Sequence, residues 1–158
     1  MSTPAFFAER LAAELPAFEK VCRALPTDKL DYKPHEKNTA AGDLAWQIAV
    51  EMASLTELFE TGDINWNAGA TPPHDEICAA LRRNAEAAIE RAKSVSEERW
   101  NGKSRMLWNG NVVSESTVSQ LGWSFLFDMI HHRGQLTAYI RPMGGKVPAV
   151  YGPSGDES

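Results

Sequence analysis

Four long segments of this chain repeat their apolar side chains at the spacing of an α-helix. They cover residues 4–25, 39–62 and 73–95, and a last segment that begins between 114 and 119 and ends near 143. An amphipathic helix of this kind must bury its apolar stripe against other elements. With little strand signal elsewhere, the pattern predicts an all-α fold, and four such helices are typical of a four-helix bundle.

The segments between these helices predict how the bundle is connected. The connections after the first and third helices are long, which indicates crossover connections. Residues 106–108 and 111–113 are expected to form a small hairpin around Asn109-Gly110, a turn signal. Pro16 predicts that the first helix is kinked or split near Leu15. Three tryptophans in the predicted loops either anchor those loops or rim a pocket: Trp66, Trp100 and Trp108.

Length and composition restrict the class of protein. The 158 residues suffice for one domain with a hydrophobic core, so a single domain over residues 1–158 is predicted. Residues 146–158 are rich in proline and glycine, which predicts a loosely packed C-terminal tail. A net charge of −5, from 16 basic and 21 acidic residues, disfavours nucleic acid as a partner. No apolar run approaches the ~20 residues that a membrane span needs. The N-terminus shows no signal-peptide pattern, so we expect a cytoplasmic protein that binds no membrane.

Several side chains with chemical potential lie outside the strongest pattern. Cys22 and Cys78 are far apart and in no Cys-x-x-Cys motif, so buried free thiols are expected and a disulfide is the minor alternative. His35 and His74 lie in proline-containing segments and are expected to be solvated. Arg133 either pairs with a carboxylate, from this chain or from a partner subunit, or faces water.

The last helical segment carries the densest group of candidate metal ligands. Asp128, His131, His132 and Gln135 share a sector of roughly 100° on that helix. An Asp and a His four residues apart can close on one ion. Such pairs also occur as plain hydrogen bonds, so the residues alone leave a metal site and a solvated surface both open.

The second helical segment offers a partner face for that group. Gln47 and Glu51 lie one turn apart on the side that also carries apolar leucines. Polar groups on a buried side need hydrogen-bond partners. Either they bond to each other within the core, or they face a ligand.

Three stretches of the sequence resemble a known family. The stretches His131 to Leu136, Val147 to Pro153 and Asp43 to Ala49 are similar to segments of DinB-like proteins. The resemblance implies a four-helix bundle with a long crossover, often a homodimer, and a divalent metal (zinc, nickel or manganese) held between the second and fourth helices. It also implies kinship with thiol-dependent transferases or isomerases that use low-molecular-weight thiols, and with members that have no assigned activity.

The resemblance also implies which positions hold the metal, and this chain departs from the pattern there. The three expected histidine positions correspond to Gln47, Asp128 and His132. Exchanging imidazole for oxygen moves a site away from zinc, nickel and copper towards harder ions. Glu51 is a further candidate ligand, with His131 as a more distant one. On the same resemblance, Gln135 and Tyr139 are expected to line the adjoining pocket.

Three interpretations follow from this departure. The first is a metal-dependent enzyme, a thiol transferase, isomerase or hydrolase, that keeps its metal with altered ligands and an open coordination position. The second is a protein that has lost the metal and binds a small ligand beside a polar cluster. The third is a dimerisation module with a vestigial pocket. The substrate itself has no recognisable sequence signal, because a fold does not fix a function.

Overall fold

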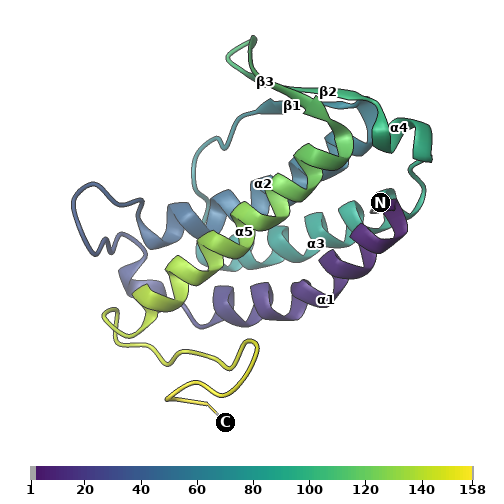
Figure 1. Cartoon of the computed structure of the whole chain (residues 1–158). Helices are drawn as coiled ribbons and strands as arrows, with labels where there is room; N and C mark the ends of the chain where they lie inside the picture. Colours follow the sequence, from purple (N-terminus) through teal and green to yellow (C-terminus); the bar gives the residue numbers. More distant parts are fainter. Residues whose placement is uncertain (1–2, 158) are drawn as a thin grey trace.

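Four long helices make up most of the protein, whose residues 3–157 are described by a computed structural model (Figure 1). They are α1 (Pro4–Arg23), α2 (Ala41–Thr61), α3 (His74–Lys93) and α5 (Val118–Ile140). Their bounds agree with the predicted helical segments to within a few residues. Two short helical elements accompany them, namely η1 (Thr27–Lys29) and α4 (Glu97–Asn101).

The helix ends follow from local sequence. Thr3 caps α1, where its hydroxyl oxygen accepts a hydrogen bond of 3.1 Å from the backbone N–H of Phe6. Thr117 and Gln120 form a capping box at the start of α5. Gly62 ends α2 with a φ of 90°, which a glycine adopts without strain. The first helix is not split, because α1 continues through Pro16, and a kink near Leu15 stays a prediction.

The four long helices pack as a bundle in which neighbours in sequence are not always neighbours in space. Helix α1 packs against α3 and α5, and helix α2 also packs against α3 and α5. Helices α1 and α2 therefore occupy opposite corners, and so do α3 and α5. This arrangement agrees with the crossover connections expected after the first and third helices.

A small three-stranded sheet corrects the all-α prediction. Strands β2 (Lys103–Trp108) and β3 (Asn111–Thr117) form the predicted hairpin, with a β-bulge between Met106 and Leu107. Strand β1 (Asp63–Trp66) adds in parallel to β2, in the order β1-β2-β3. The sequence gives no sign of β1, because the strand has only four residues and its partner lies far along the chain.

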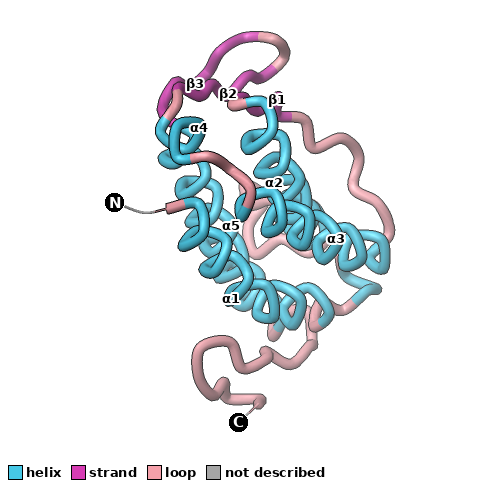
Figure 2. Tube along the Cα trace, turned by 90° about the vertical axis from the view of Figure 1, so that its right-hand side faces the viewer, coloured by secondary structure: helices cyan, strands magenta, loops and turns pink. Residues whose placement is uncertain are grey.

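The sheet and the C-terminal tail lie at opposite ends of the bundle, as both views show (Figures 1 and 2). At the sheet end, α4 contributes Trp100, which is buried with its ring 5.6 Å from that of Phe7 and 6.1 Å from that of Phe59. Trp100 therefore anchors its segment in the core. Trp108, by contrast, is exposed on the hairpin.

The tail from residue 146 to 157 forms neither helix nor strand, yet it contacts the bundle at defined places. Val147 and Val150 pack against the core. Asp156 accepts hydrogen bonds of 2.9 Å from the Arg141 side chain and from the backbone N–H of Val147. The Tyr151 hydroxyl donates a hydrogen bond of 2.6 Å to Glu14 of α1.

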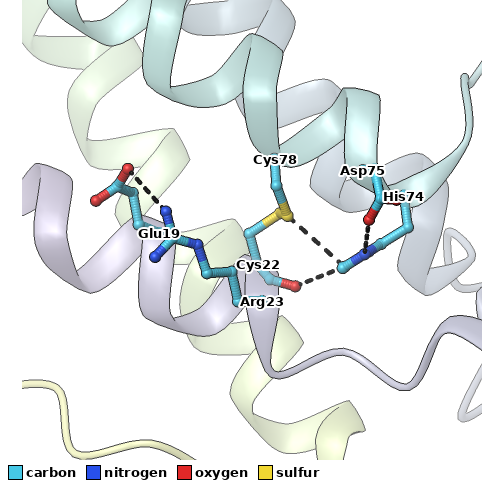
Figure 3. Close-up of a disulfide and its surroundings, with 6 residues drawn as sticks. All are labelled: Glu19, Cys22, Arg23, His74, Asp75 and Cys78. Carbon is cyan, nitrogen blue, oxygen red and sulfur yellow. Dashed lines mark hydrogen bonds and ion pairs between the residues drawn. A yellow bond between two sulfur atoms is a disulfide. The ribbon is translucent and has the colours of Figure 1, made fainter.

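Cys22 and Cys78 form a disulfide between α1 and α3 (Figure 3). The expectation of buried free thiols is therefore wrong. The two residues are 56 positions apart in sequence, but α1 ends where α3 begins, and their Cα atoms lie 6.0 Å apart. This distance is usual for a disulfide. Only the packing of the two helices reveals it.

No helix within residues 3–157 is long and apolar enough to cross a membrane.

Candidate metal site

The contact between α2 and α5 places four polar side chains opposite one another. Gln47 and Glu51 lie one turn apart on α2, and Asp128 and His132 lie one turn apart on α5. The Nε2 atom of His132 is 3.4 Å from Oδ2 of Asp128 and 3.7 Å from Oε1 of Glu51. The candidate ligands named from the sequence thus gather around one ring nitrogen.

The Gln47 side chain joins the two helices through its amide nitrogen. This nitrogen is 2.9 Å from Oε1 of Glu51 and 2.8 Å from Nε2 of His132. An amide nitrogen has two N–H groups and can donate to both acceptors. Gln47 therefore places a donor against the carboxyl oxygen and the ring nitrogen that a cation would also contact.

A second glutamine, Gln135, selects the tautomer of the His132 ring. The Nδ1 atom of His132 lies 2.9 Å from Oε1 of Gln135. Because an amide oxygen only accepts hydrogen bonds, Nδ1 carries the ring proton in this arrangement, and Nε2 presents its lone pair towards Gln47. This is the tautomer in which a histidine ligates a metal through Nε2, with the other ring nitrogen held by a hydrogen bond.

Glu51 is the most perturbed carboxyl group of the site. Its side chain is buried, and no described residue donates a hydrogen bond to its Oε2 atom. Burial raises the pKa of Glu51 to about 8. The Gln47 hydrogen bond lowers the pKa, whereas the negative charge of Asp128 and a hydrogen bond from the protonated acid to the Asp128 carboxylate raise it further. A buried polar atom without a partner is uncommon in native proteins and often indicates a bound ion or water.

The geometry of Glu51, Asp128 and His132 fits a divalent cation. One donor atom from each of them lies within 4.8 Å of the other two. Donor atoms that share one ion at about 2.1 Å lie within about 4.2 Å of each other, so only a small closure is needed. Asp128 is about half exposed, with 54% of its side-chain surface accessible, which leaves one side of the site open.

This open side faces a cavity of about 890 Å³. Its polar lining comes from Gln47, Glu51, Asp128, His131 and the serines 114 and 124. The apolar lining includes Trp66 of β1, Met106 of β2, and Phe125 and Phe127 of α5. The small sheet therefore forms one wall of the cavity, and a largely apolar surface adjoins the candidate ligands.

A comparison with known families bears on this arrangement. The model of the DinB family matches residues 1–158. The chain belongs to the DinB family. The resemblance inferred from the sequence is confirmed by this match.

Members of the DinB family with known structures share the fold over nearly the whole chain. A DinB-like protein from Bacillus cereus ATCC 10987 superimposes with a TM-score of 0.74 at 19% identity, covering 92% of this chain and 96% of the other. The DinB-like protein YjoA from Bacillus subtilis gives a TM-score of 0.68 at 16% identity, covering 96% and 97%. At these identities the likeness shows the fold alone.

One curated relative is similar in sequence. The uncharacterized protein YrdA of Bacillus subtilis strain 168 is 25% identical over 154 residues, which span 91% of this chain and 85% of that protein. Its name assigns no activity. The likeness therefore indicates no reaction for the site between α2 and α5.

The other predicted site residues lie near this centre in different roles. His131 lines the cavity but does not belong to the group of close donor atoms. Gln135 lies behind His132 as its hydrogen-bond partner. Tyr139 is buried, and its ring packs edge-on against Tyr32 at 5.8 Å. Neither Gln135 nor Tyr139 is among the residues that line the cavity.

Sequence reasoning missed part of the cavity wall. Met106 and Ser114 belong to the hairpin, and only its packing over α5 brings them to the cavity. The signal for the hairpin was its Asn109-Gly110 turn. It contained no information on which helix the hairpin would cover.

Two side chains that could have faced water lie largely inside the protein, Arg133 buried and His74 partly buried. Arg133 is 3% exposed, and its Nη1 atom lies 2.7 Å from Oε2 of Glu14 in the same chain. Its guanidinium also lies over the Phe18 ring, 4.6 Å from the centroid. The expectation that His74 is solvated is wrong, because its ring lies 2.8 Å from the carbonyl oxygen of Cys22 and only 11% of its side chain is accessible.

Proposed function

We propose that this DinB family member binds one divalent cation between α2 and α5, and that the cation serves an enzymatic reaction in the adjoining cavity. The proposed protein ligands are Glu51, Asp128 and His132. The observation that carries the proposal is the buried Oε2 atom of Glu51. No described residue donates a hydrogen bond to it, and Glu51 belongs to the same cluster as an exposed carboxylate and a ring nitrogen that presents its lone pair.

Gln47 has a specific part in this proposal. In the structure its N–H groups satisfy Glu51 and His132, the two acceptors that a cation would take. When a cation binds, the amide must rotate so that its oxygen faces the ion, or it must withdraw. A neutral amide oxygen is a weak ligand, so Gln47 competes with the cation in one orientation and adds little in the other.

The residue types set the expected class of reaction. A divalent cation in this position would lower the pKa of a bound water or thiol and polarise a substrate oxygen. The chain itself holds His132 in the ligating tautomer through Gln135 and keeps Glu51 out of water. Trp66 and Phe127 offer an apolar surface to a small substrate. We propose a thiol-dependent transferase or isomerase, or a hydrolase, with a low-molecular-weight thiol as a candidate substrate.

Metal-dependent thermal stability tests the proposal. At a free metal concentration of a hundred times Kd, binding adds about 2.7 kcal/mol to the free energy of unfolding. For a protein of this size the melting temperature should rise by about 5–10 °C. Manganese, zinc and nickel are compared, since two carboxylates and one imidazole favour harder ions than three imidazoles do.

Matched variants assign that effect to the site. Glu51→Gln and His132→Ala should abolish the rise in melting temperature, whereas His131→Ala, in the same cavity wall, should keep it. A melting temperature that no metal and no chelator changes would overturn the proposal.

One observation favours a second candidate function. The Gln47 amide already donates hydrogen bonds to Oε1 of Glu51 and to Nε2 of His132 without any ion. A protein of this kind would bind a small ligand in the cavity through Asp128 and His131 without metal. Unchanged melting curves with metals and chelators, together with stabilisation by small compounds that have both a polar and an apolar part, would support this alternative.

Homodimer formation, which is expected from the resemblance, stays a prediction. Sedimentation analysis would test it.

A further inference from the structure

A second cluster of metal-binding side chain types lies away from the cavity between α2 and α5. It joins the last turn of α1 to the first turns of α3 and contains Cys22, His74 and Cys78 (Figure 3). None of the three lines that cavity. The proposed enzymatic function makes no use of them.

The three residues are close enough to share one ion. One donor atom from each lies within 4.8 Å of the other two, and the Nε2 atom of His74 is 3.7 Å from Sγ of Cys78. His74 and Cys78 lie one turn apart on α3, so their side chains project from the same face of the helix. Cys22 reaches the same point from α1.

The position of the cluster suits exchange with solvent. Cys22 is buried, whereas Cys78 and His74 are only partly buried, so a reductant or an ion can approach from the α3 side. Figure 3 shows the His74 ring directed towards Cys22, with the exposed carboxylate of Asp75 on its other side. The distance from Nδ1 of His74 to Oδ1 of Asp75 is 3.9 Å. Ligating histidines commonly have a carboxylate at the nitrogen that does not bind the metal.

We propose that the Cys22–Cys78 disulfide is the oxidised state of a site that binds a soft divalent cation of the zinc class when it is reduced. Its ligands are the sulfur atoms of Cys22 and Cys78 and Nε2 of His74. Two cysteines and one histidine leave a fourth position of a tetrahedral ion for solvent or another ligand. Disulfides persist in oxidising compartments, whereas cysteines stay as thiols in the cytosol. The redox conditions around the protein therefore decide whether the site is a disulfide or a metal site.

The chemistry of the conversion balances. A dithiol supplies two electrons and two protons, so that the sulfur–sulfur bond becomes two thiols and the dithiol becomes a disulfide. A phosphine supplies two electrons and takes an oxygen atom from water to become the phosphine oxide, and that water supplies the two protons. The cation then displaces both thiol protons. The N–H of His74 must move from Nε2 to Nδ1, towards Asp75, and the contact between Nε2 and the Cys22 carbonyl oxygen is exchanged for the ion.

The two states place similar demands on the helices. Zinc binds each sulfur at about 2.3 Å, so two sulfur ligands lie at most about 4.6 Å apart. The Cα atoms of Cys22 and Cys78 are 6.0 Å apart. Rotation of the two side chains supplies the extra sulfur–sulfur separation. The backbones of α1 and α3 need not separate.

Cobalt absorption tests the site on the full-length protein. Cobalt bound to thiolate has a ligand-to-metal charge-transfer band that oxygen and nitrogen ligands alone do not produce. Cys22 and Cys78 are the only two cysteines of the chain, so this band reports only on the proposed site. The site of Glu51, Asp128 and His132 contains no sulfur, so failure of either proposal is recognised independently of the other.

The phosphine-reduced protein should develop this band to one equivalent of cobalt, and zinc should abolish it. The oxidised protein should show none. His74→Ala should weaken cobalt binding at least about 100-fold, since even outer-shell changes cost 10–100-fold, and the control His35→Ala should leave it unchanged. Far-UV circular dichroism verifies that each sample is folded.

Three results would overturn the proposal. One is a reduced, folded protein without the band. Another is a disulfide that a phosphine cannot reduce in the native protein. The third is loss of the fold on reduction that zinc does not prevent. Cys78→Ser should also abolish the band. If that variant fails to fold, the comparison of oxidised with reduced wild type still shows whether the two thiols bind cobalt.

Discussion

The amide nitrogen of Gln47 lies 2.8 Å from the Nε2 atom of His132, and this hydrogen bond connects α2 to the candidate metal ligand on α5. The amide donates to the lone pair that would bind a cation. The metal-free site is therefore already satisfied at this nitrogen, which makes Gln47 the residue whose replacement is most informative.

Gln47→His should strengthen metal binding. The imidazole replaces a competing N–H donor with a nitrogen ligand, and we expect affinity for zinc or nickel to rise at least about tenfold, or 1.4 kcal/mol. Isothermal titration calorimetry of the oxidised protein measures it. His131→Ala in the Gln47→His background is the control and should keep the gain. Equal affinity for metal with and without the substitution would show that position 47 does not face the ion.

Glu51 should make the metal-free protein less stable as pH rises. In the unfolded chain its carboxyl group loses the proton near 4.5, whereas in the folded protein the pKa is about 8, raised mainly by burial and also by the charge of Asp128. Between these values only the folded state holds the proton. The free energy of unfolding should therefore fall by up to about 1.4 kcal/mol per pH unit and level off above about pH 8.

Glu51→Gln removes this dependence, because the amide cannot ionise. Urea unfolding from pH 5 to pH 9, with a chelator present, compares the variant with wild type. The exposed Glu9→Gln should follow the wild-type curve. Parallel curves for wild type and Glu51→Gln would contradict the assigned burial of this carboxyl group.

Loss of the Arg133 side chain should destabilise the protein strongly. Arg133 and Glu14 form a buried ion pair, and Tyr151 of the tail also donates to Glu14. Arg133→Met leaves the buried Glu14 carboxylate with only the Tyr151 hydroxyl and the longer ion pair to Arg10 at 3.8 Å, and should cost about 3 kcal/mol in the free energy of unfolding. The double variant Glu14→Met/Arg133→Met should recover much of that loss. Arg141→Met breaks only the exposed pair with Asp156 and should have little effect.

The same network predicts sensitivity to acid. Burial alone would raise the pKa of Glu14, but the hydrogen bonds from Tyr151 and Arg133 together hold the pKa below its ordinary value of 4.5. The stabilisation is present above that value and is lost as pH falls through the lower pKa of the folded state. In Arg133→Met the decrease in the free energy of unfolding at acidic pH should be smaller than in wild type. An unchanged acid transition would contradict the role of this ion pair.

Reduction of the Cys22–Cys78 disulfide should lower stability without unfolding the protein. The bond closes a loop across 56 positions, for which chain entropy gives about 4 kcal/mol. This is less than the stability of many domains of this size. Guanidinium unfolding with and without a phosphine measures the change in the free energy of unfolding. The variant Cys22→Ala/Cys78→Ala should behave as the reduced protein does and should not respond to the phosphine.

Local signals in the sequence predicted much of the bundle. Thr3 and Gly62 mark helix ends through capping and through a left-handed backbone conformation, both of which depend on neighbouring residues. Asn109-Gly110 predicted the hairpin for the same reason, since both residues adopt positive φ in its turn. The facing of Gln47 towards His132 followed from helical spacing together with the resemblance to the family.

Features that depend on the packing of distant segments were beyond such reasoning. Strand β1 is defined by its pairing with β2, with Asp63 opposite Arg105. The disulfide of Cys22 exists because α1 ends where α3 begins, and this packing also removes most of the His74 side chain from solvent. Tyr139 lies on the expected helix, but its ring packs against Tyr32, and nothing in the local pattern chooses between a pocket and the core.

The metal content of the purified, tag-free protein tests the central claim most directly. The protein is kept oxidised, so that Cys22 and Cys78 cannot bind metal, incubated with manganese, zinc or nickel, and freed of excess ion before elemental analysis. We predict close to one equivalent per chain in wild type and in His131→Ala, and loss of the metal in Glu51→Gln and His132→Ala. Less than about a tenth of an equivalent of every metal in the wild type would contradict the account, because a tight site retains its ion and stabilises the fold.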